Sequence, residues 1–266
     1  MKLAWLTDIH LNFVPSQVLA SFFENLSAAT PDAVVISGDI GEAHDVAWRL
    51  RDLAIRLGCP IYFVLGNHDF YRGSFADVRE KIASTCSSVS NLQYLSTSGG
   101  VIQLTERTGL LGHDGWGDAR LGTPQGWKVA LNDWELIQDL RNLSERELLR
   151  KLNALGDEAA AHFRAVLPDA IEQFPELLIV THVPPFREAS WHQGRISDDD
   201  WLPHFTCKAV GDVLREAMVA HPDCKMTVLC GHTHGGGEAQ ILPNLRVLTG
   251  EAVYGQPAVW RFMEVT

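Results

Sequence analysis

The sequence predicts a single-domain α/β protein with two packed sheets, and three observations support this fold class. Short apolar runs bounded by Gly, Asn, Asp or Pro recur along the chain, which is typical of buried strands. Polar fragments follow these runs at once, as they do at the carboxyl ends of strands in open α/β sheets. The chain has 266 residues, of which 46% are hydrophobic, and this is enough for one substantial core between two sheets.

Five apolar runs have the character of buried strands. They cover residues 2–6, 33–37, 60–65, 177–181 and 226–230. The polar fragments that follow them, in the same order, are Asp8-Ile9-His10, Gly38-Asp39, Gly66-Asn67-His68-Asp69, His182 and Gly231-His232-Thr233-His234. Because loops at the carboxyl ends of strands converge while the sheet holds them rigid, we expect these fragments to meet at one edge of a sheet.

The composition of these fragments favours metal binding. Asp8 and His10 are two residues apart, as are His232 and His234, so each pair can lean to one side of an extended segment. A glycine opens three of the fragments, where the missing side chain permits a tight turn and lets an ion or a phosphate approach the backbone. Each fragment alone has a turn or capping role as its alternative. Together they supply enough oxygen and nitrogen ligands for two metal ions.

The middle of the chain is predicted to be partly helical. Residues 92–113 have the pattern of short strands separated by turns. Ser144 and Glu147 form a capping box, which predicts a helix that begins there. We expect Gly156 to interrupt this helix before a second helical stretch that ends near Phe174.

The chain is therefore predicted to be one domain, residues 1–266, with a partly helical insertion at about 115–174. The formal net charge is -11, and 22 basic against 33 acidic residues, without a run of Lys or Arg, argue against binding to extended nucleic acid. No apolar run approaches the roughly 20 residues that cross a bilayer, so we expect no membrane association. The first strand begins at once and the five cysteines are scattered, so we expect a cytoplasmic protein without a signal peptide or disulfide framework.

The ordered fragments D-x-H, GD, GNHD, H and GHxH resemble those of the calcineurin-like metallophosphoesterases. The resemblance covers residues 1 to about 110 and about 175 to 255. It implies a four-layer α/β/β/α sandwich of two mixed sheets with a partly helical insertion, and a centre for two divalent metal ions. One ion would be bound by Asp8, His10, Asp39 and His234. The other ion would be bound by Asp39, Asn67, His182 and His232.

The same resemblance implies an enzyme that hydrolyses phosphoric esters. Carboxylate, amide and imidazole ligands suit Mn, Fe, Zn, Co or Ni. The two ions would lower the pKa of a shared water, whose bridging hydroxide attacks the phosphate in line. His68 would donate a proton to the leaving group or stabilise it, and Asp69 would orient the His68 ring. The alternative for His68 is a structural role in capping its loop.

Departures from individual branches of the family narrow the expected substrate. Residues 38–42 lack the arginine of the phosphoprotein phosphatases, and His68 stands where the diacylglucosamine pyrophosphatases have arginine. The chain resembles the cyclic-nucleotide and broad-substrate phosphodiesterases more closely. We therefore expect a small phosphate ester, either a diester or a monoester. The alternative function is a catalytically silent metal-binding scaffold, which the complete set of ligand residues disfavours.

Aromatic residues are concentrated in the middle of the chain. Five of the eight tryptophans lie between residues 116 and 201, namely Trp116, Trp127, Trp134, Trp191 and Trp201. Rings near a phosphate site can stack on a base or an aryl leaving group, and an arginine can bind a phosphate with two hydrogen bonds. The candidate substrate contacts are His113, Trp116, Trp191 and Arg195. The alternatives are that the tryptophans pack the insertion onto the core and that His113 belongs to a turn.

Overall fold

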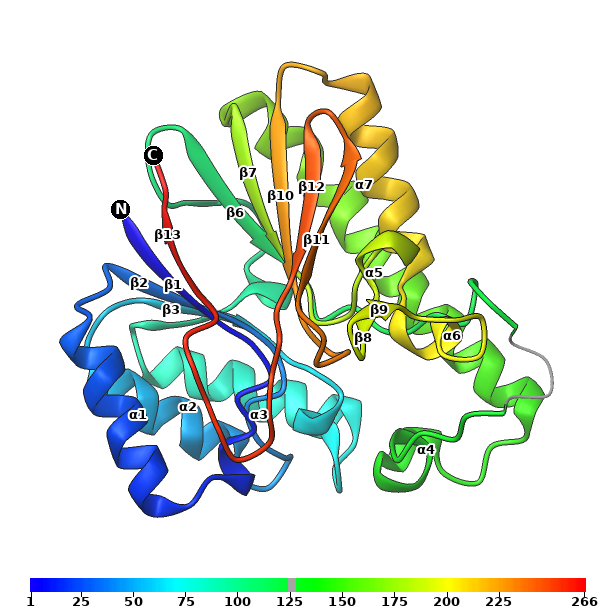
Figure 1. Ribbon diagram of the computed structural model, residues 1–266, viewed down its shortest axis with the longest axis horizontal. Helices are drawn as coiled ribbons and strands as arrows, with labels where there is room; N and C mark the ends of the chain where they lie inside the picture. The colour runs from blue at the N-terminus through cyan, green and yellow to red at the C-terminus, as the bar shows by residue number, and fades with distance from the viewer. Residues whose placement is uncertain (124–127) are drawn as a thin grey trace.

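The computed structural model describes residues 1–123 and 128–266 and shows two large sheets packed face to face (Figure 1). In spatial order, the first sheet consists of β13 (Arg261–Glu264), β1 (Lys2–Leu6), β2 (Ala33–Ser37), β3 (Ile61–Val64) and β4 (Leu92–Tyr94). The second consists of β11 (Gly237–Leu242), β12 (Leu245–Thr249), β10 (Lys225–Cys230), β7 (Glu176–Val180), β6 (Thr108–Gly112) and β5 (Ile102–Gln103). Inner strands pair in parallel, whereas β13, β11 and β5 pair antiparallel with their neighbours, so both sheets are mixed.

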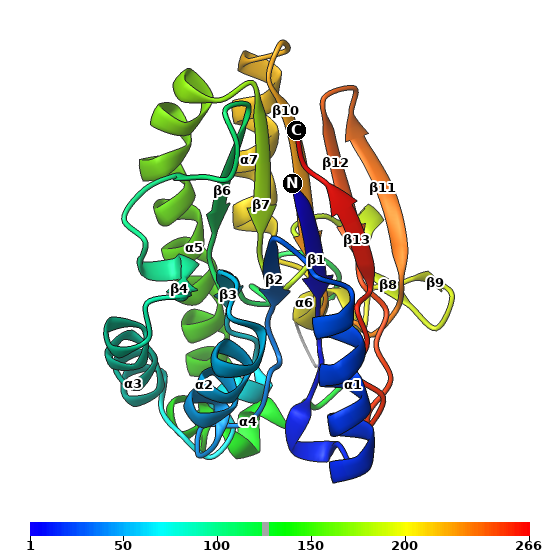
Figure 2. The same ribbon diagram turned by 90° about the vertical axis from the view of Figure 1, so that its left-hand side faces the viewer.

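Helices cover the outer faces of both sheets (Figures 1 and 2). The helices on the first sheet are α1 (Ser16–Ala28), α2 (Val46–Leu57) and α3 (Phe75–Ser88). Those on the second sheet are α5 (Glu145–Gln173) and α7 (Lys208–Ala220). Near one end of the sandwich lie α4 (Asp133–Leu136), α6 (Leu202–Phe205) and a hairpin of β8 (Trp191–His192) and β9 (Arg195–Ile196). The predicted α/β/β/α sandwich is confirmed.

Alternation along the strands explains the layers. In β1, Leu3 and Trp5 belong to the core between the two sheets, whereas Ala4 and Leu6 belong to the core beneath the helices. Both faces are buried, as expected for a parallel sheet covered on each side. The Trp5 indole N–H donates to the Ser37 hydroxyl at 3.0 Å, which satisfies the polar end of this buried ring.

Helix α5 is continuous, so the predicted interruption at Gly156 is wrong. The capping box is present at its start, because the Ser144 side chain accepts from the Glu147 N–H and the Glu147 carboxylate accepts from the Ser144 N–H. Gly156 faces the segment after β6, where a Cβ atom would lie 2.5 Å from the Cβ of Asp118. This glycine permits close packing of the helix and does not end it.

The segment predicted as an insertion contacts both halves of the sandwich. Near the start of α5, Leu148 and Leu152 pack into the same core as Phe75 on α3. Farther along, Phe163 packs with Ile179 of the second sheet, so this part of α5 is one of the outer layers. No helix within the described ranges is long and apolar enough to cross a membrane.

Candidate metal centre

Five strands deliver the predicted polar fragments to one edge of the sandwich. The observed β1, β2, β3, β7 and β10 begin and end within one residue of the runs predicted as strands. Backbone hydrogen bonds join the loops that follow them: the His10 N–H donates to the Asp39 carbonyl at 2.9 Å, and the Gly231 N–H donates to the His182 carbonyl at 2.9 Å. The convergence expected from the sequence is therefore present in the fold.

One group of predicted ligands combines two carboxylates with two imidazoles. The donor atoms of Asp8, His10, Asp39 and His234 all lie within 4.8 Å of one another. His10 Nε2 is 3.1 Å from His234 Nε2 and 3.6 Å from Asp39 Oδ2, and His234 Nε2 is 3.5 Å from Asp8 Oδ1. Such a set of oxygen and nitrogen donors suits a first-row divalent ion.

A second group contains an amide oxygen and two further imidazoles. Asn67 Oδ1 is 3.0 Å from both His182 Nε2 and His232 Nδ1, and these two nitrogens are 3.2 Å apart. His182 Nε2 also lies 3.5 Å from Asp39 Oδ1. Asp39 therefore presents one carboxylate oxygen to this group and the other to His10.

The hydrogen bonds behind these rings show that the second group fits a cation. His182 Nδ1 lies 2.8 Å from the Ser37 carbonyl, and His232 Nε2 lies 3.2 Å from the His204 carbonyl. A carbonyl only accepts, so each of these nitrogens carries the proton and the opposite nitrogen is a lone-pair donor. Burial lowers the pKa of both rings, which keeps them neutral. Two lone pairs and an amide oxygen facing one another repel unless a cation lies between them.

Asp133 orients the amide of Asn67. The Asn67 side-chain N–H donates to Asp133 Oδ1 at 2.8 Å, and the Tyr71 hydroxyl donates to the same oxygen at 2.7 Å. The amide oxygen is thereby turned toward His182 and His232. Asp133 is buried at the start of α4, far from every motif in the sequence, so nothing in the sequence identifies this role.

Without a cation, the buried carboxyl groups of the site ionise less readily than exposed ones. Burial raises the pKa of Asp8 and of Asp39 above the ordinary value of an aspartate. The neighbouring Asp8 raises the pKa of Asp39 further, because two buried negative charges repel each other. A divalent ion reverses this preference, since its charge offsets both carboxylates.

Unusual backbone conformations support the ligand positions. Among the described residues, ten that are not glycine have positive φ. Five of these are predicted ligands: Asp8, His10, Asp39, His232 and His234. A non-glycine residue in this region costs about 1–3 kcal/mol and persists at sites where the surrounding structure enforces it. Gly66 adds to the crowding, because a Cβ there would overlap the Asp39 carboxylate.

His68 lies at the rim of the site. Its ring stacks on Tyr71 with centroids 4.2 Å apart and meets the His10 ring edge-on at 4.6 Å. His68 Nε2 is 4.0 Å from Asp39 Oδ2 and 3.4 Å from the Tyr254 hydroxyl. Burial lowers the pKa of His68 to about 3. The His68 side chain thus lies between solvent and the two donor groups that share Asp39, at the rim where it is expected from the sequence.

Asp69 does not orient His68, so this prediction is wrong. Asp69 Oδ1 accepts hydrogen bonds from the Ile40 and Gly41 N–H groups at 2.9 and 2.8 Å, and Oδ2 accepts one from the Gly66 N–H at 2.9 Å. The carboxylate is fully buried and turns inward because these backbone donors need a partner. Asp69 instead fastens the Asp39 loop to the Asn67 loop.

Two of the four candidate substrate contacts are core residues. His113 is buried against His162, with ring centroids 5.1 Å apart, and its Nδ1 accepts from the Gly115 N–H. Trp116 is buried edge-on against Phe75 and borders a cavity of about 10 Å³, too small for a substrate. The packing alternative therefore describes Trp116, which shares this small cavity with Asn67 and His232. His113 is buried in the segment that follows β6.

The other two candidates lie on the hairpin beside the histidine loop. His192 of β8 places Nδ1 3.1 Å from the Thr233 carbonyl, which joins the hairpin to this loop. Trp191 is partly buried over Gly237, whereas Arg195 is exposed. Trp127 lies outside the described residues. The hairpin thus borders the site, without a contact between these two side chains and the ligand groups.

Sequence reasoning did not identify Tyr254 as part of the site. Its ring lies 4.5 Å from that of His10, 4.8 Å from that of His234 and 5.4 Å from that of Phe13, measured between centroids. Tyr254 follows β12, whose carboxyl end lies at the same edge of the sandwich as that of β10. The signal available in the sequence was therefore an aromatic residue after a sixth strand that ends at this edge.

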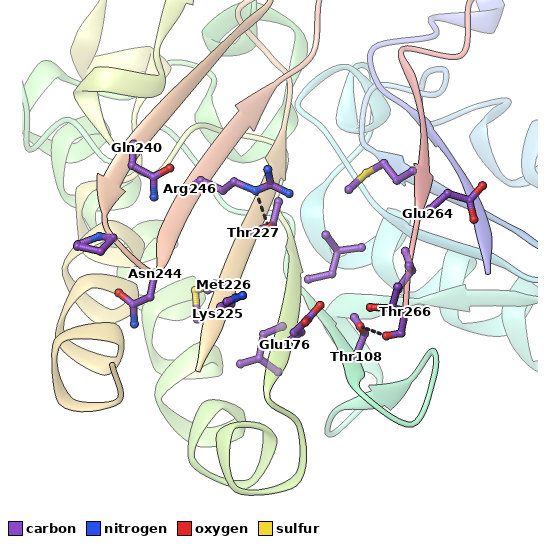
Figure 3. Close-up of a pocket in the computed structure, with 15 residues that line it drawn as sticks. Thr108, Glu176, Lys225, Met226, Thr227, Gln240, Asn244, Arg246, Glu264 and Thr266 are labelled. Atoms are coloured by element: carbon purple, nitrogen blue, oxygen red, sulfur yellow. Dashed lines mark hydrogen bonds between the residues drawn. The ribbon is translucent and has the colours of Figure 1, made fainter. Parts of the chain in front are cut away.

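A separate cavity of about 420 Å³ lies at the opposite end of the strands. Glu176 and Lys225, the first residues of β7 and β10, contribute to its lining (Figure 3). Its polar groups are partly paired with one another, since Arg246 Nε donates to Thr227 Oγ1 at 3.0 Å. The cavity is thus remote from the carboxyl ends that carry the predicted ligands.

Comparison with known proteins identifies the family. The sequence model of the calcineurin-like phosphoesterases matches residues 1–236. The chain belongs to this family. This phosphoesterase is 38% identical over 80 residues to a probable cyclic nucleotide phosphodiesterase of Synechococcus sp., a match that covers 26% of this chain and 31% of that protein. The chain thus matches about a third of that relative's length.

Solved structures show the same fold as this phosphoesterase. A phosphopantetheinyl hydrolase from Mycobacterium tuberculosis is 17% identical, with a TM-score of 0.68 over 99% of this chain and 95% of that chain. A dimetal phosphatase from Danio rerio is 13% identical, with a TM-score of 0.60 over 96% of this chain and 88% of that chain. The chain is thus a member of a phosphoesterase family, and the likeness to the two solved structures supports its fold.

Proposed function

We propose that this phosphoesterase hydrolyses small phosphoric esters at a centre formed by the two groups of donors that share Asp39. The observation that carries the proposal is the opposite orientation of the two Asp39 oxygens, 3.6 Å from His10 Nε2 and 3.5 Å from His182 Nε2. The proposed ligands of one ion are Asp8, His10, Asp39 and His234, and those of the other are Asp39, Asn67, His182 and His232.

The chemistry of the donors determines what the site can do. When bound, two divalent ions supply an activated water and neutralise the charge of a phosphate during in-line displacement. Asp8 and Asp39 contribute two negative charges, so a centre with two divalent cations stays positive and attracts an anionic ester, despite the net charge of -11. The nitrogen and oxygen donors suit Mn, Fe, Zn, Co or Ni.

Measurement of turnover tests the proposed hydrolytic function directly. Protein loaded with Mn²⁺ is expected to hydrolyse bis(p-nitrophenyl) phosphate, p-nitrophenyl phosphate or both, and metal analysis of the same preparation is expected to give two ions per chain. The partial likeness to a protein named as a phosphodiesterase favours the diester. Two bound ions without turnover across several metals and esters would instead identify a metal-binding scaffold.

His68 assists the leaving group in this proposal, as a proton donor or as a stabiliser of its charge. Its ring stands beside Asp39 at the rim of the site and is held there by Tyr71. The Tyr254 hydroxyl lies within hydrogen-bond distance of Nε2, the nitrogen that faces the site. Asp69 supports this arrangement indirectly, by fixing the backbone of the loop that carries His68.

The His68→Ala variant is expected to lose turnover in proportion to the help that the leaving group needs. For a phenyl ester, we expect a loss of about 10²–10⁴-fold, the usual contribution of a positioned acid or base. A p-nitrophenyl ester is expected to lose less, since p-nitrophenolate is a better leaving group. Steady-state rates for both esters measure the difference, with the exposed His221→Ala variant as the control. Full turnover with both ions bound would exclude His68 from the mechanism.

A further inference from the structure

Three exposed side chains form an apolar surface beside the proposed metal centre. Phe13, Val253 and Tyr254 are 50%, 52% and 51% exposed, and we call this surface the aromatic ledge. Large aromatic side chains gain from burial, and exposed apolar groups gathered beside a polar site are typical of ligand-binding surfaces. All three side chains are uncharged, so the ledge offers no attraction to a second phosphate.

The fold holds the two rings of the ledge together. Phe13 ends a short helical turn, Leu11–Phe13, that follows His10. Tyr254 lies in the connection from β12 to β13, which crosses from the second sheet to the first (Figure 1). A turn closed by the Gln256 N–H and the Val253 carbonyl, 3.0 Å apart, places Tyr254 against Phe13. The two rings are nearly perpendicular, at 86°, with centroids 5.4 Å apart.

The ledge lies on the His68 side of the site, where the proposed reaction releases the alcohol. The Tyr254 ring contacts the rings of His10 and His234, with centroids 4.5 and 4.8 Å apart. Its hydroxyl is 3.4 Å from His68 Nε2. An alcohol that receives assistance from His68 therefore extends toward the exposed ring of Tyr254.

We propose that the aromatic ledge binds the planar aromatic part of the ester's alcohol, such as an aryl ring or a nucleobase. This inference rests on the proposed function, because it places the phosphate between the two donor groups. A flat aromatic group stacks well on an exposed ring, and the uncharged ledge offers no ion pair to a charged partner. The ledge thereby selects among phosphate esters by the alcohol, while the metal centre binds the phosphate that all of them share.

Phosphonate binding distinguishes the contribution of the aromatic ledge from that of the metal centre. Methylphosphonate reaches only the phosphate site, whereas phenylphosphonate also presents a flat ring. Calorimetry on the Mn²⁺-loaded protein is expected to show tighter binding of phenylphosphonate. The ratio of the two affinities is expected to fall about three- to tenfold in Phe13→Ala and in Tyr254→Ala, as for the loss of one aromatic pair. Tyr254→Phe keeps the ring and is expected to keep the ratio.

Two controls make the result specific. Trp48→Ala removes a 57% exposed ring on α2 and is expected to leave the ratio unchanged. Cyclohexylphosphonate, which is apolar but not flat, is expected to bind less tightly than phenylphosphonate. An unchanged ratio in both ledge variants would overturn the ledge alone. Failure of both phosphonates to bind the loaded wild-type protein would overturn the proposed function as well.

Discussion

Replacement of Asp39 by alanine is expected to reduce the turnover of Mn²⁺-loaded protein at least about 10³-fold, since metal assistance is worth several kcal/mol and each 1.36 kcal/mol is a factor of ten in rate. Asp39 is the one predicted ligand whose two oxygens face both donor groups. Its loss therefore removes a ligand from each proposed ion. The measurements are kcat and the number of ions per chain.

The effect of Asp39 is separated from a general loss of structure by two further variants. Asp39→Asn keeps the shape of the side chain and removes its charge, so we expect it to retain the fold and lose most of the activity. Asp52→Ala removes an acid that pairs with Arg56 on the surface of α2 and is expected to keep full turnover. An Asp39→Ala variant with two ions and normal kcat would show that the two groups do not form one centre.

Removal of metal is expected to destabilise the protein. Ligand binding at about 100 times its dissociation constant adds about 2.7 kcal/mol, which corresponds to a rise of about 5–10 °C in melting temperature. The effect grows with pH. In the metal-free protein the pKa of Asp39 is raised above 3.8 by burial and by Asp8. The folded protein therefore holds this proton more tightly than the unfolded chain does, and the free energy of unfolding falls as the pH rises above 3.8. Bound ions keep it ionised and remove that loss.

Melting temperatures with chelator and with Mn²⁺, at about pH 5.5 and about pH 7.5, measure this coupling. We expect the stabilisation by metal to be larger at the higher pH, because binding displaces a proton from the Asp39 carboxyl. Asp39→Ala is expected to show a smaller stabilisation with a weaker dependence on pH. Equal stabilisation at both pH values would show that metal binding displaces no proton from Asp39 between them.

Local sequence patterns were sufficient to predict the five strands that precede the candidate ligands and the polar residues that follow them. Buried parallel strands are apolar over their whole length, so their ends are marked by the first polar residues, such as Asp8 after β1. The convergence of the loops then followed from the topology of α/β sheets. The capping box at Ser144 was equally local, and it was confirmed.

The parts that failed depend on contacts between distant segments. Asp69 was expected to contact its neighbour His68, but three backbone donors from two loops compete for its carboxylate. Gly156 has the local character of a helix terminator, but it is a glycine because Asp118 packs closely against the helix there. Tyr254 reaches the site only because its loop crosses between the sheets, and no periodicity in the sequence reports such a crossing.

The hydrogen bond between Asp133 and the Asn67 amide limits how this protein can be redesigned. Residues 115–174 are the natural target for exchanging one specificity loop for another, because none of the motif fragments of the family lies in them. That segment also carries the acid that turns an amide oxygen toward His182 and His232. A transplanted loop therefore needs a carboxylate at the same place, and substrate range and ion affinity cannot be engineered independently.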